Sequence, residues 1–364
     1  MKYRTLPHGN ESISIIGLGS SSLAAAGQQE AVATVRMALQ AGVNFFDLAA
    51  GDAAAFGIYG EALADCRYQV YLQVHFGADY RSGQYGWTQD PAAIRDSVTW
   101  QLQQLKTDYI DFAMIHCVDE DDDLQTALNN GVIDWMCQLK KQGMIRHLGL
   151  STHTPSIAHQ LLDRKLIDIL MFSINPAYDY QHGDYAIGNV EERAALYRRC
   201  EAEGVGISVM KAFCGGQLLN EKTSPFAQAL TRWQCLRYAL DRPGVLTVLP
   251  GVRDREDLRQ ILGYLQASDE ETDYSVLASL TVRQALGVCV YCNHCQPCSA
   301  GLDIGLINKY YDLSQAGDAL AKDHYHHLTK KASDCLQCGH CDRRCPFHVA
   351  QMRRMRQIAE TFGE

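Results

Sequence analysis

The sequence predicts an α/β protein in which a (β/α)8 TIM barrel over residues 1–275 is followed by a small, mostly helical domain over residues 276–364. Short β-rich runs alternate with amphipathic runs through the first part of the chain. Eight of the fourteen cysteines lie in two dense runs in the last part. Hydrophobic residues make up 47% of the 364 residues, which is enough for a large core.

Eight runs in the first part are rich in β-branched and aromatic residues, which is typical of strands. We expect these strands at residues 14–19, 43–49, 69–76, 109–116, 145–151, 168–175, 206–213 and 245–251. Amphipathic runs between them predict helices at residues 30–42, 90–107, 131–143, 156–165, 190–204 and 255–265. Because the strands alternate with helices, the sheet is expected to be all parallel.

Polar residues stand where these apolar strands end. In barrels of this kind the chemistry is carried out at the carboxyl ends of the strands. Polar side chains would be costly there if they were simply buried, so each is a candidate site residue. The candidates are Asp47, His75, His116, Ser151, Asn175, Lys211 and Arg253.

The two cysteine runs predict a metal domain. In a reducing compartment such runs indicate metal ligands before disulfides. In two-cluster ferredoxins the last cysteine of each run binds the cluster of the other run. Carried over to this chain, that rule predicts two [4Fe–4S] clusters. One would be held by Cys289, Cys292, Cys295 and Cys345, and the other by Cys335, Cys338, Cys341 and Cys298.

The second run fits the bacterial pattern completely, including Pro346, whereas the first departs from it. Only two residues precede Cys298 in its run, and Ser299 stands where proline is usual. A pair of zinc sites is the alternative, although zinc ribbons normally separate their CxxC pairs. The six other cysteines are interpreted as small buried hydrophobic residues.

Composition argues against two other classes of protein. The formal net charge is −9, and a nucleic-acid-binding protein would favour a concentrated basic face. The first residues, "MKYRTLPHGNESIS", lack the apolar centre of a secretion signal, and nowhere do eighteen apolar residues run together. We therefore expect a soluble, cytoplasmic protein that binds neither nucleic acid nor a membrane.

Four segments carry a family resemblance: "GVNFFDLA", "LKTDYIDFAMIH", "IRHLGLST" and "LPGVRDREDL". In this order, over most of residues 1–270, they resemble the aldo-keto reductases. With "VMKAFCGGQLL" and the two cysteine runs, the whole chain resembles the branch that carries a ferredoxin-like iron–sulfur domain. The resemblance implies a nicotinamide cofactor across the top of the barrel. It also implies hydride transfer between carbonyl and alcohol, with a tetrad of Asp, Tyr, Lys and His.

Only two positions of that tetrad match. Asp47 ends the second strand and His116 ends the fourth, but the family spacing places the tyrosine position on Asp52. His75 replaces the lysine, and Tyr59 is expected in the following helix. Asp52, His75 and His116 are therefore candidate proton-transfer residues oriented by Asp47, since imidazole titrates near neutral pH. Alternatively, Asp52 is a solvated loop residue.

The cofactor positions differ from the family in part. Lys211 stands where an aromatic residue would stack on nicotinamide, whereas Asn175 is kept. Gly251 and Arg253 close the eighth strand beside a helix N-terminus, where backbone N–H groups and guanidinium groups suit a phosphate. Together with Ser151 these are the candidate cofactor-binding residues, for NADP(H) or a flavin.

Clusters pass single electrons, whereas a reduced nicotinamide gives up two at once, and flavin is the usual converter. The sequence therefore favours an iron–sulfur oxidoreductase. Its clusters would relay electrons between a ferredoxin-like partner and a small-molecule substrate or flavin at the barrel mouth. One alternative is an NADPH-dependent aldo-keto reductase with structural or sensory clusters. The other is a non-catalytic redox sensor.

Overall fold

The computed structural model describes residues 1–49, 51–180, 185–280, 287, 289, 291, 295–315, 321–345 and 347–364. The chain forms two compact units. The first, here called the barrel unit, takes in Met1–Ile174, Val205–Phe213 and Leu246–Ala267. The second, the helical unit, takes in Asn175–Gly204, Cys214–Val245 and Ser268–Glu364. The domain boundary after residue 275 stays a prediction.

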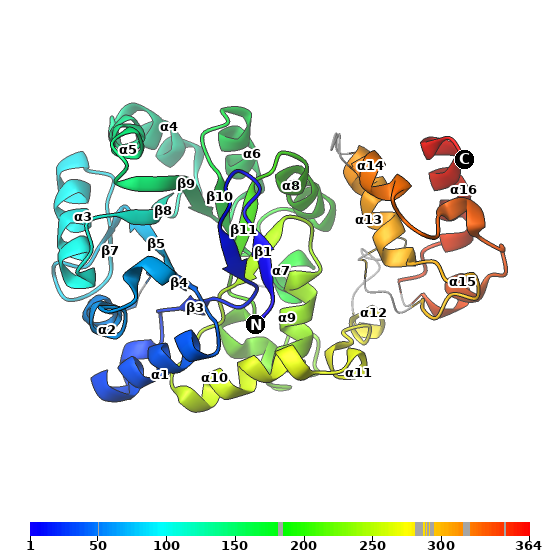
Figure 1. Cartoon of the computed structure of the whole chain (residues 1–364), viewed down its shortest axis with the longest axis horizontal. Helices are drawn as coiled ribbons and strands as arrows, with labels where there is room; N and C mark the ends of the chain where they lie inside the picture. The colour runs from blue at the N-terminus through cyan, green and yellow to red at the C-terminus, as the bar shows by residue number, and fades with distance from the viewer. Residues whose placement is uncertain are drawn as a thin grey trace. The chain divides into compact units, whose positions relative to one another are not determined.

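The barrel unit is built on one eight-stranded parallel sheet (Figure 1). Its strands are β3 (Leu18–Gly19), β4 (Phe45–Asp47), β5 (Tyr71–Phe76), β8 (Ile110–Ile115), β9 (Ile145–Thr152), β10 (Ile169–Ser173), β11 (Gly206–Met210) and β12 (Val245–Val248). Parallel bridges Ile16–Val248 and Gly19–Gly251 join the two edge strands and close the barrel. All eight predicted strands are confirmed, each within the run that predicted it or one residue beyond.

Helices follow the strands as the alternation predicts. The barrel unit contains α1 (Gln28–Gln40), α2 (Ala54–Ala62), α3 (Pro91–Leu105), α4 (Asp121–Asn129), α5 (Val132–Lys141), α6 (Pro155–Asp163) and α10 (Arg255–Leu262), with single turns η1 (Leu23–Ala26), η2 (Arg67–Gln69) and η4 (Gly263–Gln266). The helix α3 starts where the sequence predicts it, because Asp90 caps its first N–H groups and Pro91 occupies the first helical position. The helix α4 was not predicted; it begins with three aspartates, which favour a helix N-terminus.

Two small antiparallel hairpins accompany the sheet. They are formed by β1 (Tyr3–Thr5) with β2 (Ser12–Ser14), and by β6 (Ala78–Asp79) with β7 (Gly86–Trp87). Gly77 connects the end of β5 to the second hairpin. Its φ is 121°, a backbone conformation that glycine adopts readily and other residues rarely do. A Cβ atom on Gly77 would lie 3.3 Å from His116 Cβ. Glycine therefore allows this hairpin to run close to the end of β8.

The helical unit contains α7 (Pro176–Asp179), η3 (Cys214–Leu219), α8 (Val190–Ala202), α9 (Arg232–Leu240), α11 (Asp269–Thr272), α12 (Leu277–Leu280), α13 (Ile304–Gln315), α14 (Ala321–His326), η6 (Ala332–Asp334), α15 (His340–Arg344) and α16 (Gln351–Phe362). The buried Asp179 joins three of them: it accepts hydrogen bonds from Arg193 Nε (2.7 Å), Tyr197 OH (2.6 Å) and Tyr238 OH (2.8 Å). A separate apolar core in this unit includes Ile307, Met355 and Cys295.

None of the described helices combines the length and apolar character needed to cross a membrane. 

Two glycines of α2 give a matched test of how this helix packs on α3. A Cβ atom on Gly60 would lie 2.0 Å from the backbone oxygen of Gln104, whereas Gly57 has open space at that position. Gly60→Ala is expected to lower the free energy of unfolding, measured by urea, by about 1–3 kcal/mol because backbone must shift. Gly57→Ala is expected to raise it by about 0.5–1 kcal/mol, since alanine favours the helix. Equal effects of the two substitutions would contradict this packing.

Candidate functional site

Four side chains form a continuous hydrogen-bonded chain at the carboxyl ends of β4, β5 and β8. Asp47 Oδ1 lies 2.8 Å from His75 Nε2, and His75 Nδ1 lies 2.8 Å from His116 Nδ1. At the outer end, His116 Nε2 lies 3.0 Å from the hydroxyl of Tyr85. We call Asp47, His75, His116 and Tyr85 the proton chain.

The pleat of β5 explains why the inner half of this chain forms. Residues two apart on a strand share a face, so Gln73 and His75 both point into the barrel. Asp47 pairs directly with Gln73 across β4 and β5. Gln73 Nε2 donates to Asp47 Oδ1 at 2.7 Å, and Ser208 Oγ donates to Gln73 Oε1 at 2.9 Å. These bonds hold the Asp47 carboxylate in place from the barrel interior.

The outer end of the chain comes from the β6–β7 hairpin. Tyr85 immediately precedes β7, and its ring lies 5.9 Å from the ring of the buried Tyr80. Trp87 Nε1 donates to the backbone oxygen of His116 at 3.4 Å, and Ser97 Oγ of α3 donates to Ala78 O at 2.8 Å. The hairpin is therefore tied both to the end of β8 and to α3. Tyr85 is 44% exposed, so the chain runs from the barrel interior to solvent.

The electrostatic surroundings keep His116 neutral. Burial, together with the neighbouring His75 ring, lowers the pKa of His116 well below its usual value of 6.5. A carboxylate oxygen only accepts hydrogen bonds, so His75 Nε2–H is the donor to Asp47 Oδ1. His75 Nδ1 then accepts from His116 Nδ1–H, and His116 Nε2 accepts from the hydroxyl of Tyr85. These tautomers are assigned from the hydrogen-bond network.

Two residues near the family's tyrosine position lie outside this chain. Asp52 is exposed, and its Oδ1 accepts from the backbone N–H of Ala54 at 2.7 Å, which is the solvated loop role that the sequence left open. Tyr59 lies in α2, as expected, and is fully buried. Burial, with the charge of Asp47, raises the pKa of Tyr59, so this phenol does not ionise near neutral pH.

The other strand-end candidates are divided between the units. Ser151 is buried in β9, and its backbone oxygen accepts from Val118 N at 3.1 Å. Lys211 follows β11 and has a left-handed φ of 57°. Its ammonium group lies near Cys117, since its charge works against the rise in the pKa of that thiol. Asn175 belongs to the helical unit, where its Oδ1 caps α7 by accepting from Tyr178 N at 2.9 Å.

The expected phosphate end lies beside β3 and β12. A Cβ atom on Gly251 would meet only Ser22 Oγ, at 3.8 Å, so space is open there. Arg253 donates to both carboxylate oxygens of Asp257, and Arg255 donates in the same way to Glu30 of α1. The sequence did not predict these carboxylate partners.

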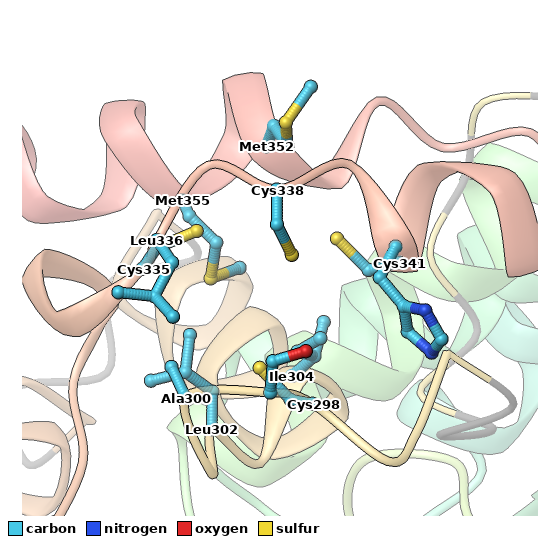
Figure 2. Close-up of a pocket in the computed structure, with 12 residues that line it drawn as sticks. Cys298, Ala300, Leu302, Ile304, Cys335, Leu336, Cys338, Cys341, Met352 and Met355 are labelled. Carbon is cyan, nitrogen blue, oxygen red and sulfur yellow. The ribbon is translucent and has the colours of Figure 1, made fainter.

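Four of the predicted cluster ligands meet in the helical unit. Figure 2 shows a pocket lined by Cys298, Cys335, Cys338 and Cys341, and the sulfur atoms of Cys338 and Cys341 point toward the same space as that of Cys298. Apolar side chains, including those of α13 and α16, complete the lining. These are the four cysteines that the sequence assigns to the second cluster.

The first set of cluster ligands is described only in part. Cys295 and Cys345 are buried, and Cys289 is half-buried. Cys292 and Pro346 lie outside the described residues. The ligand assignment for this cluster therefore stays a prediction.

Two features of the barrel rim were missed by sequence reasoning. One is Tyr85, because the family spacing points to the loop after β4 rather than to the loop after β5. The other is the group Cys117, Asp119 and His153, whose ligand atoms lie within 4.8 Å of one another. A signal for this group is present in the segments "HCVD" and "STHT", which lie at the carboxyl ends of neighbouring strands.

A closed parallel barrel with ionisable side chains at the carboxyl ends of its strands is typical of barrel enzymes. The model of the Aldo/keto reductase family matches residues 15–234. The chain therefore belongs to the aldo/keto reductase family and is an oxidoreductase of that family.

Known relatives agree with this family. The uncharacterized oxidoreductase YqkF of Bacillus subtilis is 30% identical over 284 residues, covering 71% of this chain and 90% of that protein. L-galactose dehydrogenase of Arabidopsis thaliana is 28% identical over 176 residues, which is 45% of this chain and 52% of that protein.

Among solved structures, aldo-keto reductase AKR11C1 from Bacillus halodurans in its holo form aligns with a TM-score of 0.62 and 22% identity. The alignment covers 78% of this chain and 97% of that chain. An aldo/keto reductase from Klebsiella pneumoniae in complex with NADP and acetate has a TM-score of 0.55 and 23% identity, over 77% and 94% of the two chains. These likenesses show that the fold is shared.

The lowered pKa of His116 predicts how stability depends on pH. As the pH falls below about 6.5, the unfolded chain binds a proton at this residue before the folded protein does. The contribution of His116 to the free energy of unfolding therefore falls by up to about 1.4 kcal/mol per pH unit, until the pH reaches the pKa of His116 in the folded protein. Above about pH 6.5 this contribution is fully present. His116→Gln should reduce the loss measured by urea unfolding between about pH 7 and about pH 5.

The exposed His327 gives the control, because His327→Gln removes a histidine that is 76% exposed. This variant should keep the pH dependence of the unaltered protein. A pH dependence that is the same for all three proteins would contradict the neutral state of His116.

Proposed function

We propose that this protein is a nicotinamide-dependent oxidoreductase that interconverts a carbonyl group and an alcohol, with Tyr85 as its proton-transfer residue. The observation that carries the proposal is the proton chain, which links the half-exposed Tyr85 hydroxyl to the buried Asp47 through two histidines. The chain lies at the barrel rim where enzymes of this fold carry out their chemistry.

The residues at the phosphate end of the barrel fit a nucleotide cofactor. Gly251 leaves open space at the rim, and Gly19 of β3 pairs with it. Among the residues that the structure describes, the buried Ser20 Oγ has no hydrogen-bond partner, so it is available to a ligand oxygen. Arg253 and Arg255 flank the start of α10, but a phosphate would share them with Asp257 and Glu30.

A bound NADPH would supply the hydride, so the side chains of this chain need to supply only the proton. In alcohol oxidation, the Tyr85 oxygen accepts the substrate's hydroxyl proton while its own proton passes to His116 Nε2. The Nδ1 proton of His116 moves to His75, and the Nε2 proton of His75 moves to Asp47. Carbonyl reduction runs the same transfers in reverse. A proton taken up by Asp47 then starts the series, and Tyr85 delivers its own proton to the substrate oxygen.

Two imidazoles suit this role better than a lysine would. Each ring accepts a proton at one nitrogen and releases one at the other, which an ammonium group does not do. The low pKa of His116 favours rapid release of an extra proton rather than its storage. The family's usual tyrosine and lysine pair is thus replaced by a tyrosine from a different loop and a histidine pair.

Removal of the Tyr85 hydroxyl tests this proposal. Tyr85→Phe should lower kcat for NADPH-dependent reduction of an aldehyde by about 10²–10⁴-fold, because general acid catalysis is lost. The Kd for NADPH, measured by fluorescence quenching, should not change. Tyr68→Phe is the matched control, since Tyr68 is 76% exposed and belongs to η2 rather than to the β6–β7 hairpin. Unchanged turnover by Tyr85→Phe would overturn the assignment.

We also propose that the helical unit holds two [4Fe–4S] clusters, as in the ferredoxin-bearing branch of the superfamily. The support is the pocket in which Cys298 joins Cys335, Cys338 and Cys341, as the rule for two-cluster ferredoxins requires. Cys298 comes from the first run, and its arrival among the cysteines of the second run is the feature that distinguishes that rule from two separate zinc sites.

Iron content provides the test of this second proposal. In protein purified and reconstituted without oxygen, Cys338→Ser should lose up to about half of the bound iron and acid-labile sulfide, because one of two clusters loses a ligand. Cys137→Ser changes a half-buried cysteine of α5 and should leave the iron content unchanged. Zinc in place of iron in the unaltered protein would contradict the proposal.

An electron relay remains a further candidate function. In it, the clusters would exchange electrons between a ferredoxin-like partner and a substrate or flavin at the barrel mouth. Stereospecific hydride transfer from labelled NADPH that persists in Cys298→Ser would argue for structural or sensory clusters. Loss of turnover in that variant would argue for the relay. A redox sensor without catalysis would keep its response when His75 and His116 are replaced by alanine.

A further inference from the structure

We infer that Cys117, Asp119 and His153 form a binding site for one zinc ion at the barrel rim. Their ligand atoms lie within 4.8 Å of one another. His153 Nδ1 lies 2.9 Å from Asp119 Oδ2, and Cys117 Sγ lies 3.8 Å from the same oxygen. Ligands of a tetrahedral zinc ion, with bonds of about 2.0–2.3 Å, are separated by about 3.3–3.8 Å. Small side-chain movements would therefore complete the site.

The two loops that carry these ligands are already held together. Thr152 Oγ1 and His153 N both donate to Asp119 Oδ1, at 3.0 and 2.6 Å. Thr154 Oγ1 donates to the backbone oxygen of Asp119 at 2.9 Å. Because Oδ1 is occupied in this way, Oδ2 faces the sulfur and the imidazole. Outer hydrogen bonds of this kind orient the ligands of metal sites.

The chemistry of the three ligands favours zinc over other common cations. A thiolate and an imidazole are ligands that zinc prefers, whereas magnesium and calcium prefer oxygen. Although burial works against it, hydrogen bonds from His153 hold the pKa of Asp119 at about 2, so the carboxylate is charged. With Cys117 as thiolate, two negative charges would balance the charge of one zinc ion.

A nucleophilic role for Cys117 fits the geometry less well. Burial, with the neighbouring carboxylate of Asp119, raises the pKa of the Cys117 thiol to about 11, whereas reactive thiols have a lowered pKa. The sulfur's hydrogen-bond partner is Asp119, whose carboxylate is not a suitable general base for it. Zinc would replace the proton of the thiol and stabilise the thiolate, as metal binding at cysteine generally does.

Three protein ligands leave a fourth position open, which is typical of catalytic zinc sites. Cys117 directly follows His116, and the charges of Asp119 and His153 already influence the pKa of His116. A zinc ion here would therefore hold a substrate oxygen, such as a hydroxyl or carboxylate, beside the proton chain. This last step rests on the proposed function, but the zinc site itself does not.

Zinc uptake by the full-length protein tests the inference. The protein, with its iron already loaded, is titrated with Zn²⁺ in competition with a chromophoric chelator. The unaltered protein should bind about one equivalent more than Cys117→Ser or His153→Gln, because each variant removes one of three ligands. Cys137→Ser, which changes a cysteine outside the site, should bind as much as the unaltered protein. Equal uptake by all four proteins would overturn the inference.

The ligand set gives a second, independent measurement. X-ray absorption at the zinc edge of the unaltered protein should show one sulfur and two nitrogen or oxygen neighbours from the protein. Zinc held by four sulfurs would place the metal in the cysteine runs and would also overturn the site. Tyr85→Phe should lose turnover but keep its zinc, so failure of the zinc site and failure of the proposed function are distinguished.

Discussion

The hydrogen bond between His75 and Asp47 is the contact on which the proton chain depends. It is made in the barrel interior, where water does not compete, and it determines which nitrogen of His75 carries a proton. That assignment in turn determines the tautomer of His116 and the direction in which Tyr85 donates. The bond exists because β4 and β5 are parallel neighbours, so that their carboxyl ends bring the two side chains together.

In the proposed function, the role of the family's proton donor passes to a residue from another loop. Asp52 stands at the family's tyrosine position after β4, and the hydroxyl that contacts His116 belongs to Tyr85 of the β6–β7 hairpin after β5. Gly77 makes this possible because a side chain there would crowd His116. A barrel holds its rim residues on separate loops, so one loop can take over a role that another has lost. This explains how family membership and a changed tetrad are compatible.

The helical unit and the barrel rim place their sulfur atoms in different surroundings. Cys298 and Cys341 lie in a pocket with apolar walls, which suits a large cofactor held by several thiolates. Cys117 instead lies beside a carboxylate and an imidazole, which suits a single small cation. The spacing of the cysteines in the sequence reveals the first environment, because those cysteines lie in dense runs. It does not reveal the second, because Cys117 has no other cysteine near it in the sequence.

The sequence by itself determined the eight strands, six of the helices, the family resemblance and the grouping of Cys298 with the second cysteine run. These features depend on local periodicity and on spacing, which a chain carries along its length. The tertiary structure alone decided that Tyr85 reaches His116, that Asp52 stays in solvent, and that Cys117, Asp119 and His153 meet. Such contacts join residues from separate loops, and their geometry depends on strand register and hairpin path. No local pattern encodes that geometry, because it arises only when the barrel closes.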